Sequence, residues 1–390
     1  MKRDVYLILR EFIQNELRIC EDLLLSGDYA ALFKALDKLR AEARKSGLWN
    51  FTLPAEYEGH GLSYAEFAPL SEILGWSPLG HYVCNVQAPD IGNMELLLHH
   101  GTDEQQHRWL APLASGEIRS CFAMTEPENA GSNPTLMGTK AELKNGKWII
   151  NGRKWFTTGA DGAGVVIVMA VTDPDAPKHC RASMFIVSAD NPGFRIIRNI
   201  PVMGDAGSGW LSHGEVEFVN CTVDESAIIG KPGDGFVLAQ ERLGPGRIHH
   251  GMRWIGIAER ALSMTCKRAL IRKISPNTVL ADNDAFQSKV AESRADIEAV
   301  RALMLSTASF LDSGSMKSGR SRISLIKFLA SDMLMKVLDF AIQTHGALGV
   351  TDDTILSFFY RHERGARIYD GPDEVHMMVV AREELKKYRS

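Results

Sequence analysis

The chain has 390 residues, of which 45% are hydrophobic and 24% charged, a balance typical of an ordinary globular protein. Its net charge of −4, from 44 basic and 48 acidic residues, argues against a nucleic-acid-binding protein. No apolar run reaches the roughly 18 residues that a membrane-spanning helix needs. The six cysteines are scattered, with no Cys-x-x-Cys pair, which favours reduced thiols in a cytoplasmic protein and predicts neither disulfides nor a metal site.

Three zones follow one another along the chain. Residues 1–120 show helical periodicity broken by turns, as in the runs Ala65 to Leu74 and Asn93 to His99. Residues 121–235 carry short segments rich in β-branched and aromatic residues, such as VVIVMAV and EVEFV. The close spacing of these segments leaves no room for crossover helices, so we expect an antiparallel barrel or sandwich.

The third zone, 236–390, returns to helical periodicity. Four long helices are expected there, and together they would form a bundle. Their expected ranges are 247–272, 282–313, 317–345 and 373–388. The whole chain is therefore predicted to be an α+β protein with a helical domain, a β-domain and a helical bundle, in that order.

Two stretches of the β-zone could contact a ligand. The first, CFAMTEPENAGSN from Cys121 to Asn133, offers hydroxyls and free backbone N–H groups to an anion. The second, Lys154 to Gly159, places adjacent aromatics before hydroxyls, an arrangement that suits a flat ring. The first could equally be an ordinary polar turn, and the second an ordinary strand with an aromatic in the core.

Two further stretches lie in the bundle zone. In Ile368 to His376, Pro372 or Asp373 could open the last helix, which leaves Asp370 outside it, either as a functional acid or as a second capping acid. The segment GPGRIHHG opens a predicted helix with His249 and His250, which cannot share one helix face because they are adjacent. No G-x-G-x-x-G follows a strand, so a Rossmann-type nucleotide site is not expected.

Taken in order, these stretches resemble the acyl-CoA dehydrogenase family over nearly the whole chain. The likeness is strongest to the subgroup of vertebrate acyl-CoA dehydrogenase family members ten and eleven. The matching stretches are Thr125-Glu126-Pro127, Trp155-Phe156-Thr157-Thr158, Gly233-Asp234-Gly235-Phe236, Arg247, Arg272, Gln343, His345-Gly346-Ala347-Leu348-Gly349 and Tyr369-Asp370-Gly371. The resemblance implies an α-helical N-terminal domain, a middle β-barrel and a C-terminal four-helix bundle, with FAD as the cofactor.

The resemblance also implies roles for single residues. Asp370 matches the base that removes the substrate α-proton, and Arg247, His249 and Gly371 are expected near the substrate. The positions expected to contact FAD are Phe122, Met124, Thr125, Ser132, Phe156, Thr158 and Gly346, with Arg272 and Gln343 reaching the FAD of a neighbouring subunit. A homo-oligomer, a dimer or a tetramer, is therefore expected, with an electron-transferring flavoprotein as electron acceptor.

The sequence departs from the common family pattern at several positions. The usual Arg-x-x-Phe-Gly reads Arg272-Lys-Ile-Ser-Pro276, and the turn before Ser132 is one residue longer than in the commonest members. Asn133 replaces a common Asp, and Ala347 replaces a second Gly. Asp370 replaces the more common Glu, as it does in the subgroup.

The implied reaction is the FAD-dependent α,β-dehydrogenation of an acyl-CoA thioester to the trans-2-enoyl-CoA, a step of fatty-acid catabolism. Acyl chain length, branching and hydroxylation stay open. The chain could instead be a flavin oxidase of the nitroalkane type, again with Asp370 as base. It could also be a non-catalytic DNA-binding flavoprotein, against which the net charge argues, or an interaction scaffold without a ligand.

Overall fold

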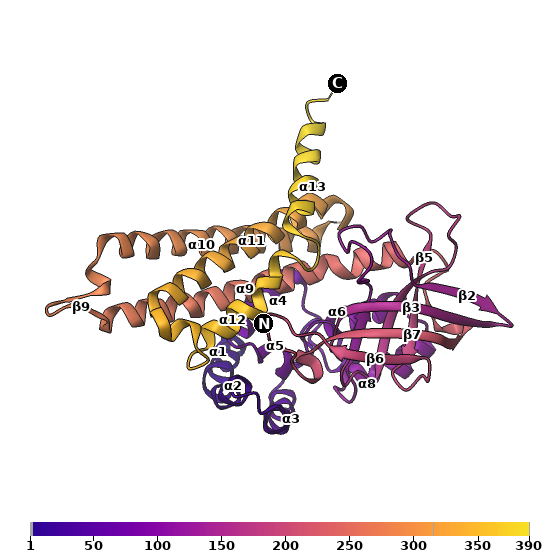
Figure 1. Cartoon of the computed structure of the whole chain (residues 1–390), viewed down its shortest axis with the longest axis horizontal. Coiled ribbons are helices and arrows are strands. Elements are labelled where there is room, and N and C mark those ends of the chain that lie inside the picture. The colour runs from indigo at the N-terminus through magenta and orange to yellow at the C-terminus, as the bar shows by residue number, and fades with distance from the viewer. Residues whose placement is uncertain (1–2, 315, 390) are drawn as a thin grey trace. The chain divides into compact units, whose positions relative to one another are not determined.

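The computed structural model of this chain describes residues 3–314 and 316–389 and divides into two compact units (Figure 1). The helical unit combines Met1–Thr52, Gly61–Cys84 and Arg247–Ser390, and the sheet unit combines Leu53–His60 with Asn85–Gly246. Each unit thus gathers segments that lie far apart in the sequence. The boundary falls inside one helix, α9 (Gly235–Ile271), whose first turns belong to the sheet unit.

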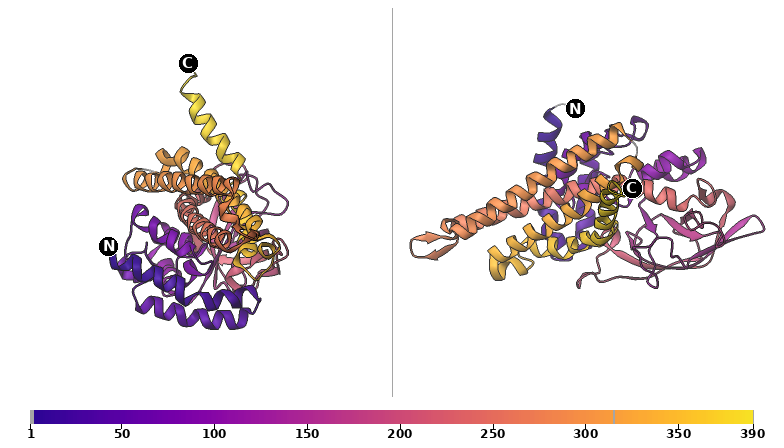
Figure 2. Two further views of the ribbon diagram at one scale, coloured as in Figure 1. Left: turned by 90° about the vertical axis from the view of Figure 1, so that its left-hand side faces the viewer. Right: turned by 90° about the horizontal axis from the view of Figure 1, so that it is seen from above.

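The helical unit is built on three long helices that lie side by side (Figures 1 and 2). These are α9, α10 (Asp284–Ser313) and α11 (Met316–His345), and α13 (Asp373–Lys386) packs against α11. The bundle helices expected from the sequence are confirmed apart from their ends. Around them are α1 (Arg3–Glu11), α2 (Arg18–Leu25), α3 (Tyr29–Lys45), α4 (Tyr64–Gly75), α5 (Gly80–Val83) and α12 (Ile355–Glu363).

One sequence expectation about these helices is wrong, and one helix is not predicted. Gly244-Pro-Gly246 is typical of a helix start and predicts that α9 begins at 247, but the helix begins at Gly235 and runs through Pro245. A proline inside a helix removes one hydrogen bond, and this long helix tolerates the loss. The sequence pattern also misses α12, which is only nine residues long. None of the described helices is long and apolar enough to cross a membrane.

Two glycines set the distance between α4 and α9 inside the helical unit. A Cβ on Gly256 would lie 2.0 Å from the carbonyl oxygen of Glu72, and a Cβ on Gly75 would lie 2.3 Å from that of Arg253. No side chain fits at either position, so the two backbones approach directly. On α4, the hydroxyl of Ser71 donates a 3.0 Å hydrogen bond to the carbonyl oxygen of His249. This contact fixes the part of α9 that carries His249 and its neighbours.

The sheet unit contains an eight-stranded sheet whose main path runs β6-β7-β3-β2-β4-β5-β8. Figure 1 shows β3, β6 and β7 side by side. The strands are β1 (Ser120–Ala123), β2 (Lys140–Lys144), β3 (Lys147–Thr158), β4 (Val165–Val171), β5 (Ala182–Ser188), β6 (Phe194–Asn199), β7 (His213–Asp224) and β8 (Ile228–Ile229). Helix α6 (Asp90–His100) belongs to this unit and contacts β1.

The expectation of a wholly antiparallel sheet is wrong. Strand β1 pairs with β4 in parallel, with Cys121 opposite Val166, and β2 also meets β4 in parallel at Lys140. A parallel pair needs a long connection, and the 41 residues that separate β1 from β4 include the β2–β3 hairpin. Both faces of β4 are buried, since Ile167 and Val168 belong to two different core clusters. This central strand therefore anchors β1 and the segment that follows it.

Candidate functional site

Asp370 lies in a tight turn immediately before α13. Its φ is +56°, in the left-handed region, and Gly371 follows with a φ of +98°. Pro372 is the N-cap of α13 and no side chain caps this helix, so the interpretation of Asp370 as a second capping acid is wrong. A non-glycine residue held at positive φ costs free energy, and such residues are common at functional sites. The carboxylate is thus presented by the turn without serving the helix.

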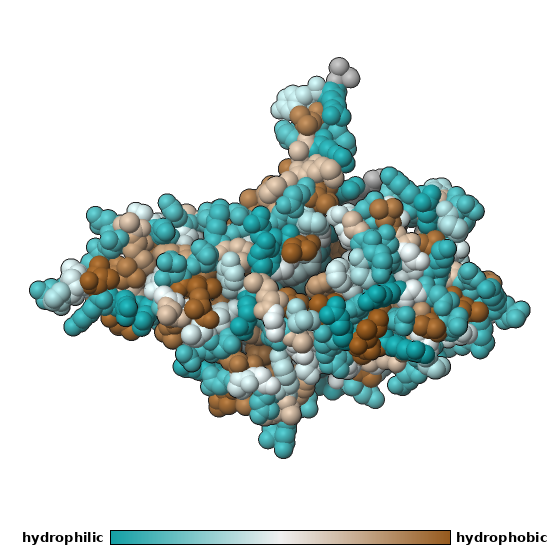
Figure 3. Space-filling view, in the orientation of Figure 1, coloured by the Kyte–Doolittle hydropathy of each residue, from teal (hydrophilic) through white to brown (hydrophobic). Residues whose placement is uncertain are grey.

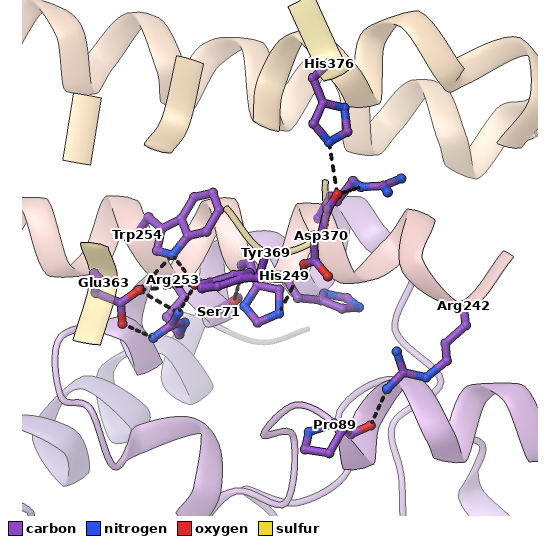
Figure 4. Close-up of polar contacts among 12 residues, drawn as sticks. Ser71, Pro89, Arg242, His249, Arg253, Trp254, Glu363, Tyr369, Asp370 and His376 are labelled. Atoms are coloured by element: carbon purple, nitrogen blue, oxygen red, sulfur yellow. Dashed lines mark hydrogen bonds and ion pairs between the residues drawn. The ribbon is translucent and has the colours of Figure 1, made fainter. Parts of the chain in front are cut away.

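The backbone carbonyl oxygen of Asp370 accepts two hydrogen bonds. Nε of Arg247 donates one of 3.0 Å and Nε2 of His376 donates the other, also of 3.0 Å (Figure 4). Because a carbonyl oxygen can only accept, Nε2 of His376 must carry the proton, and its Nδ1 accepts from the Ser324 hydroxyl at 3.1 Å. Burial lowers the pKa of His376 to about 4, so this neutral form persists near pH 7.

The first residue of α13 holds the other side of the turn. The buried carboxylate of Asp373 accepts hydrogen bonds from Nζ of Lys327 at 3.0 Å, from Oγ of Ser331 at 2.9 Å and from Nε of Arg367 at 2.7 Å. Breaking a buried ion pair of this kind is costly, because it leaves an uncompensated charge. Asp370 therefore lies between anchors on α9, α11 and α13.

The carboxylate of Asp370 differs from its backbone in having few partners. Oδ2 is buried and has no hydrogen-bond partner among the described residues. The nearest cationic or imidazole nitrogen recorded for it is Nε2 of His250, at 3.5 Å. A buried carboxylate oxygen without a hydrogen bond is costly unless a ligand uses it. Its surroundings therefore suit a base that accepts a proton from a substrate.

Arg247 and His249 point to different surroundings although both lie near the middle of α9. Arg247 contacts the backbone of Asp370, and its role toward a substrate stays a prediction. His249 is buried, and its ring packs edge-on against Phe67 at 5.0 Å and against Tyr64 at 6.2 Å. The expectation that His249 and His250 do not share a face is confirmed. The role of His249 toward a substrate stays a prediction.

Three further expected residues of the helical unit lie at the surface. Arg272 directly follows α9, Gln343 lies in the last turn of α11, and Gly346 begins the next 3-10 segment with a φ of +64°. All three are exposed or partly exposed. Their surfaces are thus accessible to a neighbouring molecule. The contact of Arg272 and Gln343 with the FAD of another subunit stays a prediction, as does the contact of Gly346 with FAD.

In the sheet unit, the segment after β1 is fastened to β3. The backbone N–H of Trp155 donates to the carbonyl oxygen of Thr125 at 3.0 Å, and the Thr125 hydroxyl donates back to the Trp155 carbonyl at 2.9 Å. The register of β3 against β7 shifts between Lys154 and Thr157, which marks a bulge. Two of the expected cofactor-binding stretches are therefore brought together.

Phe156 lies within this bulge. Its φ is +50°, and its side chain is 43% exposed while Trp155 packs edge-on against it at 5.0 Å. Thr158, two residues on, shares a 2.9 Å hydrogen bond with Nδ1 of His213. An exposed aromatic ring on a strained backbone beside hydroxyl groups fits a flat aromatic ligand such as a flavin.

A buried ion pair between Lys154 and Glu126 stabilises the segment that contains Thr125. Nζ of Lys154 donates to Oε1 of Glu126 and to the carbonyl oxygen of Met124, both at 2.9 Å. Burial alone would raise the pKa of Glu126, but Lys154 and the backbone N–H groups of Gly138 and Thr139 outweigh it and lower the pKa to about 2. Glu126 therefore stays ionised and fixes the turn.

Phe122 and Ser132, the other expected cofactor-binding residues of this unit, differ in their surroundings. The guanidinium carbon of Arg242 lies 4.0 Å from the centre of the Phe122 ring, and Nε of Arg242 donates to Oδ1 of Asn93 at 2.8 Å. Figure 4 shows the same Arg242 side chain reaching Pro89. Ser132 is exposed in the longer turn, and no contact in the described residues marks it as a cofactor ligand.

The sequence interpretation assigns no definite role to His250, His376 or Trp254. A signal exists for two of them, since Arg247, His250 and Trp254 are spaced i, i+3, i+7 and share a helix face. His376 offers no such signal, because its contact with Asp370 depends on the turn geometry.

Comparison with known proteins agrees with this arrangement. Models of the acyl-CoA dehydrogenase N-terminal, middle and C-terminal domains match residues 7–117, 121–221 and 233–385. The "Probable acyl-CoA dehydrogenase FadE2" of Mycobacterium tuberculosis is 42% identical over 91% of this chain and 86% of its own length. Mouse acyl-CoA dehydrogenase family member 10 is 40% identical over 98% of this chain, which spans 37% of that protein.

A solved structure of a candidate acyl-CoA dehydrogenase from Mycobacterium abscessus is similar throughout. It is 42% identical, with a TM-score of 0.94 over 99% of this chain and 98% of that one. The expected fold class and the expected likeness to members ten and eleven are confirmed. The chain therefore belongs to the acyl-CoA dehydrogenase family, whose members are FAD-binding oxidoreductases.

Proposed function

We propose that the chain catalyses α,β-dehydrogenation of an acyl-CoA thioester to the trans-2-enoyl-CoA, with Asp370 as the base. The observation that carries this proposal is the carboxylate of Asp370, neither oxygen of which accepts a hydrogen bond from the described residues, while its backbone carbonyl is held twice. A rigid backbone with an uncommitted carboxylate suits proton abstraction. A nitroalkane oxidase and a DNA-binding flavoprotein are not favoured by the comparisons.

In this reaction Asp370 takes the α-proton of the acyl chain on a carboxylate oxygen. Arg247 and His376 hold the Asp370 backbone, so the carboxylate is aimed without the helix having to move. The backbone N–H of Asp370 is the proposed donor to the thioester oxygen, on which negative charge develops. FAD, when bound, accepts the β-hydrogen as hydride.

The proposed flavin site uses the sheet unit for the ring. Phe156, Met124 and Phe122 supply apolar contacts, and Thr125 and Thr158 supply hydroxyls. Ser132 would contact the pyrophosphate through its exposed hydroxyl. Arg272 and Gln343 are proposed to contact the FAD of a second subunit and Gly346 to contact FAD, roles that their exposure supports.

A homo-oligomer is part of the same proposal. Leu270 and Ile271 at the end of α9 are 65% and 72% exposed. Ile274, in the hairpin of β9 (Lys273–Ser275) and β10 (Thr278–Val279), is 54% exposed. Figure 3 shows hydrophobic side chains at the surface near this end of the long helices. Exposed apolar patches mark interaction surfaces. Light scattering on the purified protein distinguishes monomer, dimer and tetramer.

The substrate is proposed to lie against Arg247, His249 and Gly371, with an electron-transferring flavoprotein as the electron acceptor. A panel of straight, 2-methyl and hydroxyacyl-CoAs of increasing length tests the substrate class. Each is mixed with the FAD-loaded protein without oxygen, and loss of the oxidised flavin absorbance is followed. At least one acyl-CoA is expected to bleach the flavin.

Replacing the base tests the assignment directly. Asp370→Asn is expected to slow bleaching by at least about 10²–10⁴-fold while FAD stays bound, because the amide cannot accept the proton. Glu374→Gln removes an exposed carboxylate four residues away and serves as the control. Bleaching by the Asp370→Asn protein at the wild-type rate would contradict the proposal, as would hydrogen peroxide release with a nitroalkane and no reaction with any acyl-CoA.

A further inference from the structure

His250 faces the carboxylate of Asp370 from α9. Its Nε2 lies 3.5 Å from Oδ2, the oxygen that has no hydrogen bond among the described residues. The two side chains are only 20% and 14% exposed. The distance is slightly longer than a hydrogen bond, and such contacts in ligand-free active sites often shorten when substrate binds.

Aromatic packing holds the His250 ring in this orientation. The ring is stacked on Trp254, with centroids 6.1 Å apart and planes 22° apart, and Tyr369 packs on it at 5.4 Å. Trp254 is itself fixed, because its Nε1 donates to Glu363 at 3.0 Å and to the Tyr369 hydroxyl at 3.2 Å (Figure 4). The imidazole therefore has little freedom to turn away from Asp370.

Burial keeps the His250 ring neutral, although the charges around it act in both directions. Burial lowers the pKa of His250 to about 4, and Arg253 and His249 act in the same direction, while Asp370 and Glu363 oppose it. Arg253 is paired with Glu363 through a 2.8 Å hydrogen bond. A neutral imidazole has one N–H donor and adds no positive charge, so it can orient a carboxylate without neutralising it.

Arg247 hydrogen-bonds a different part of Asp370. Its Nε donates to the backbone carbonyl oxygen, and its charge acts on the carboxylate without a recorded hydrogen bond to it. Two side chains of the same helix, one turn apart, thus face the backbone and the carboxylate of the proposed base. The carboxylate has two equivalent oxygens, and a donor at Oδ2 selects which one faces the substrate.

We propose that His250 is a positioning residue for the base: its Nε2–H engages Oδ2 of Asp370 and leaves the other carboxylate oxygen aimed at the substrate α-hydrogen. This inference rests on the proposed function, since it assigns a partner to the proposed base. Sequence position alone could not distinguish His250 from His249, which packs against α4.

The test isolates proton removal from hydride transfer. An α-deuterated acyl-CoA with sulfur in place of the β-carbon can lose its α-deuteron but has no β-hydrogen to give up. Exchange of that deuteron into water is followed by NMR with the FAD-loaded enzyme. Three variants are compared with the wild type: His250→Gln, His250→Asn and His250→Leu. Glutamine can place an amide N–H near the Nε2 position, whereas asparagine is too short and leucine has no donor.

The asparagine and leucine variants are expected to exchange about 10- to 100-fold more slowly than the wild type, as expected for loss of a hydrogen bond to a charged group. The glutamine variant is expected to recover most of that loss. Bound FAD and the unfolding midpoint of the glutamine and asparagine variants should be similar, because both carry a polar amide and neither is larger than the histidine that it replaces.

Two results would overturn the inference. One is wild-type exchange in all three variants. The other is an equal loss of exchange in the glutamine and asparagine variants that parallels their loss of FAD, which would show a packing role only. If the wild type itself neither exchanges the deuteron nor bleaches with any acyl-CoA, the proposed function fails first, and the assignment of His250 fails with it.

Discussion

Nε2 of His376 donates a 3.0 Å hydrogen bond to the backbone carbonyl oxygen of Asp370, six residues earlier in the chain. The contact ties the first turn of α13 back to the turn that precedes it. His376 is itself buried and held by Ser324 on α11. The proposed base is thus positioned through its main chain by a side chain that need not touch the substrate.

Replacing His376 should loosen this turn. His376→Leu is expected to lower kcat/KM for acyl-CoA-dependent flavin reduction by about 10-fold, because loss of one buried hydrogen bond costs about 1–3 kcal/mol and Arg247 still holds the carbonyl. Ser324→Ala, which leaves the bond to Asp370 in place, is the matched control and should have the smaller effect. Equal kinetics for wild type and His376→Leu would show that Arg247 alone suffices.

Gly371 should not tolerate a side chain. Its φ is +98°, and a Cβ there would lie 2.8 Å from Nε2 of His376. Gly371→Ala is therefore expected to destabilise the protein by about 1–3 kcal/mol and to reduce the rate of flavin reduction. Gly246→Ala is the control, because no atom lies within 4 Å of the new Cβ and the position is helical. This variant should be more stable than the wild type by up to about 1 kcal/mol. Urea unfolding of both variants measures the contrast.

Stability should fall as the pH drops from about 6.5 to about 4. Burial lowers the folded-state pKa of His250 and His376 to about 4, from a usual value of 6.5, and also lowers that of His81. Between these values the unfolded chain binds more protons than the folded chain, so the free energy of unfolding rises with pH there. The contribution of these histidines to stability is complete above about pH 6.5. For His376 the difference corresponds to about 3 kcal/mol.

Urea unfolding at several pH values measures this dependence. His376→Gln removes one of the titrating groups and should flatten the curve between pH 4 and 6.5, where the wild-type curve is steepest. A variant curve parallel to that of the wild type would show that His376 does not contribute.

Much of the fold and part of the site could be predicted from the sequence. The helix periods predict α10 and α11 nearly to the residue, because long amphipathic patterns are strong local signals. Asp370 is identifiable because it lies outside the helix that follows it. The parallel pairing of β1 with β4 is not, since it depends on where a strand lies in the sheet and not on its own residues.

The partners of the proposed base, Asp370, are harder to predict. Arg247 and Asp370 are 123 residues apart, and Arg247 binds the backbone oxygen of Asp370. Every residue has a backbone oxygen, so the amino-acid type at 370 does not indicate this contact. His250 and His249 differ in role because they point to different sides of α9. The rotation of α9 about its own axis is set by its close backbone contact with α4 at Gly75 and Gly256. Tertiary packing, not local pattern, decides these roles.

The ion pair of Lys154 and Glu126 offers a test of the sheet unit by itself. Lys154→Met leaves the Glu126 carboxylate buried without its cation and frees the Met124 carbonyl, so we expect a loss of about 3–5 kcal/mol and weaker FAD retention. Adding Glu126→Gln removes the unpaired charge and should restore part of that stability. The pKa of Glu126 is lowered to about 2, so the stability it contributes is present above its usual value of 4.5 and is lost as the pH falls from there toward 2. Thermal unfolding of the single and double variants measures the coupling, and additive losses would show that the two charges act independently.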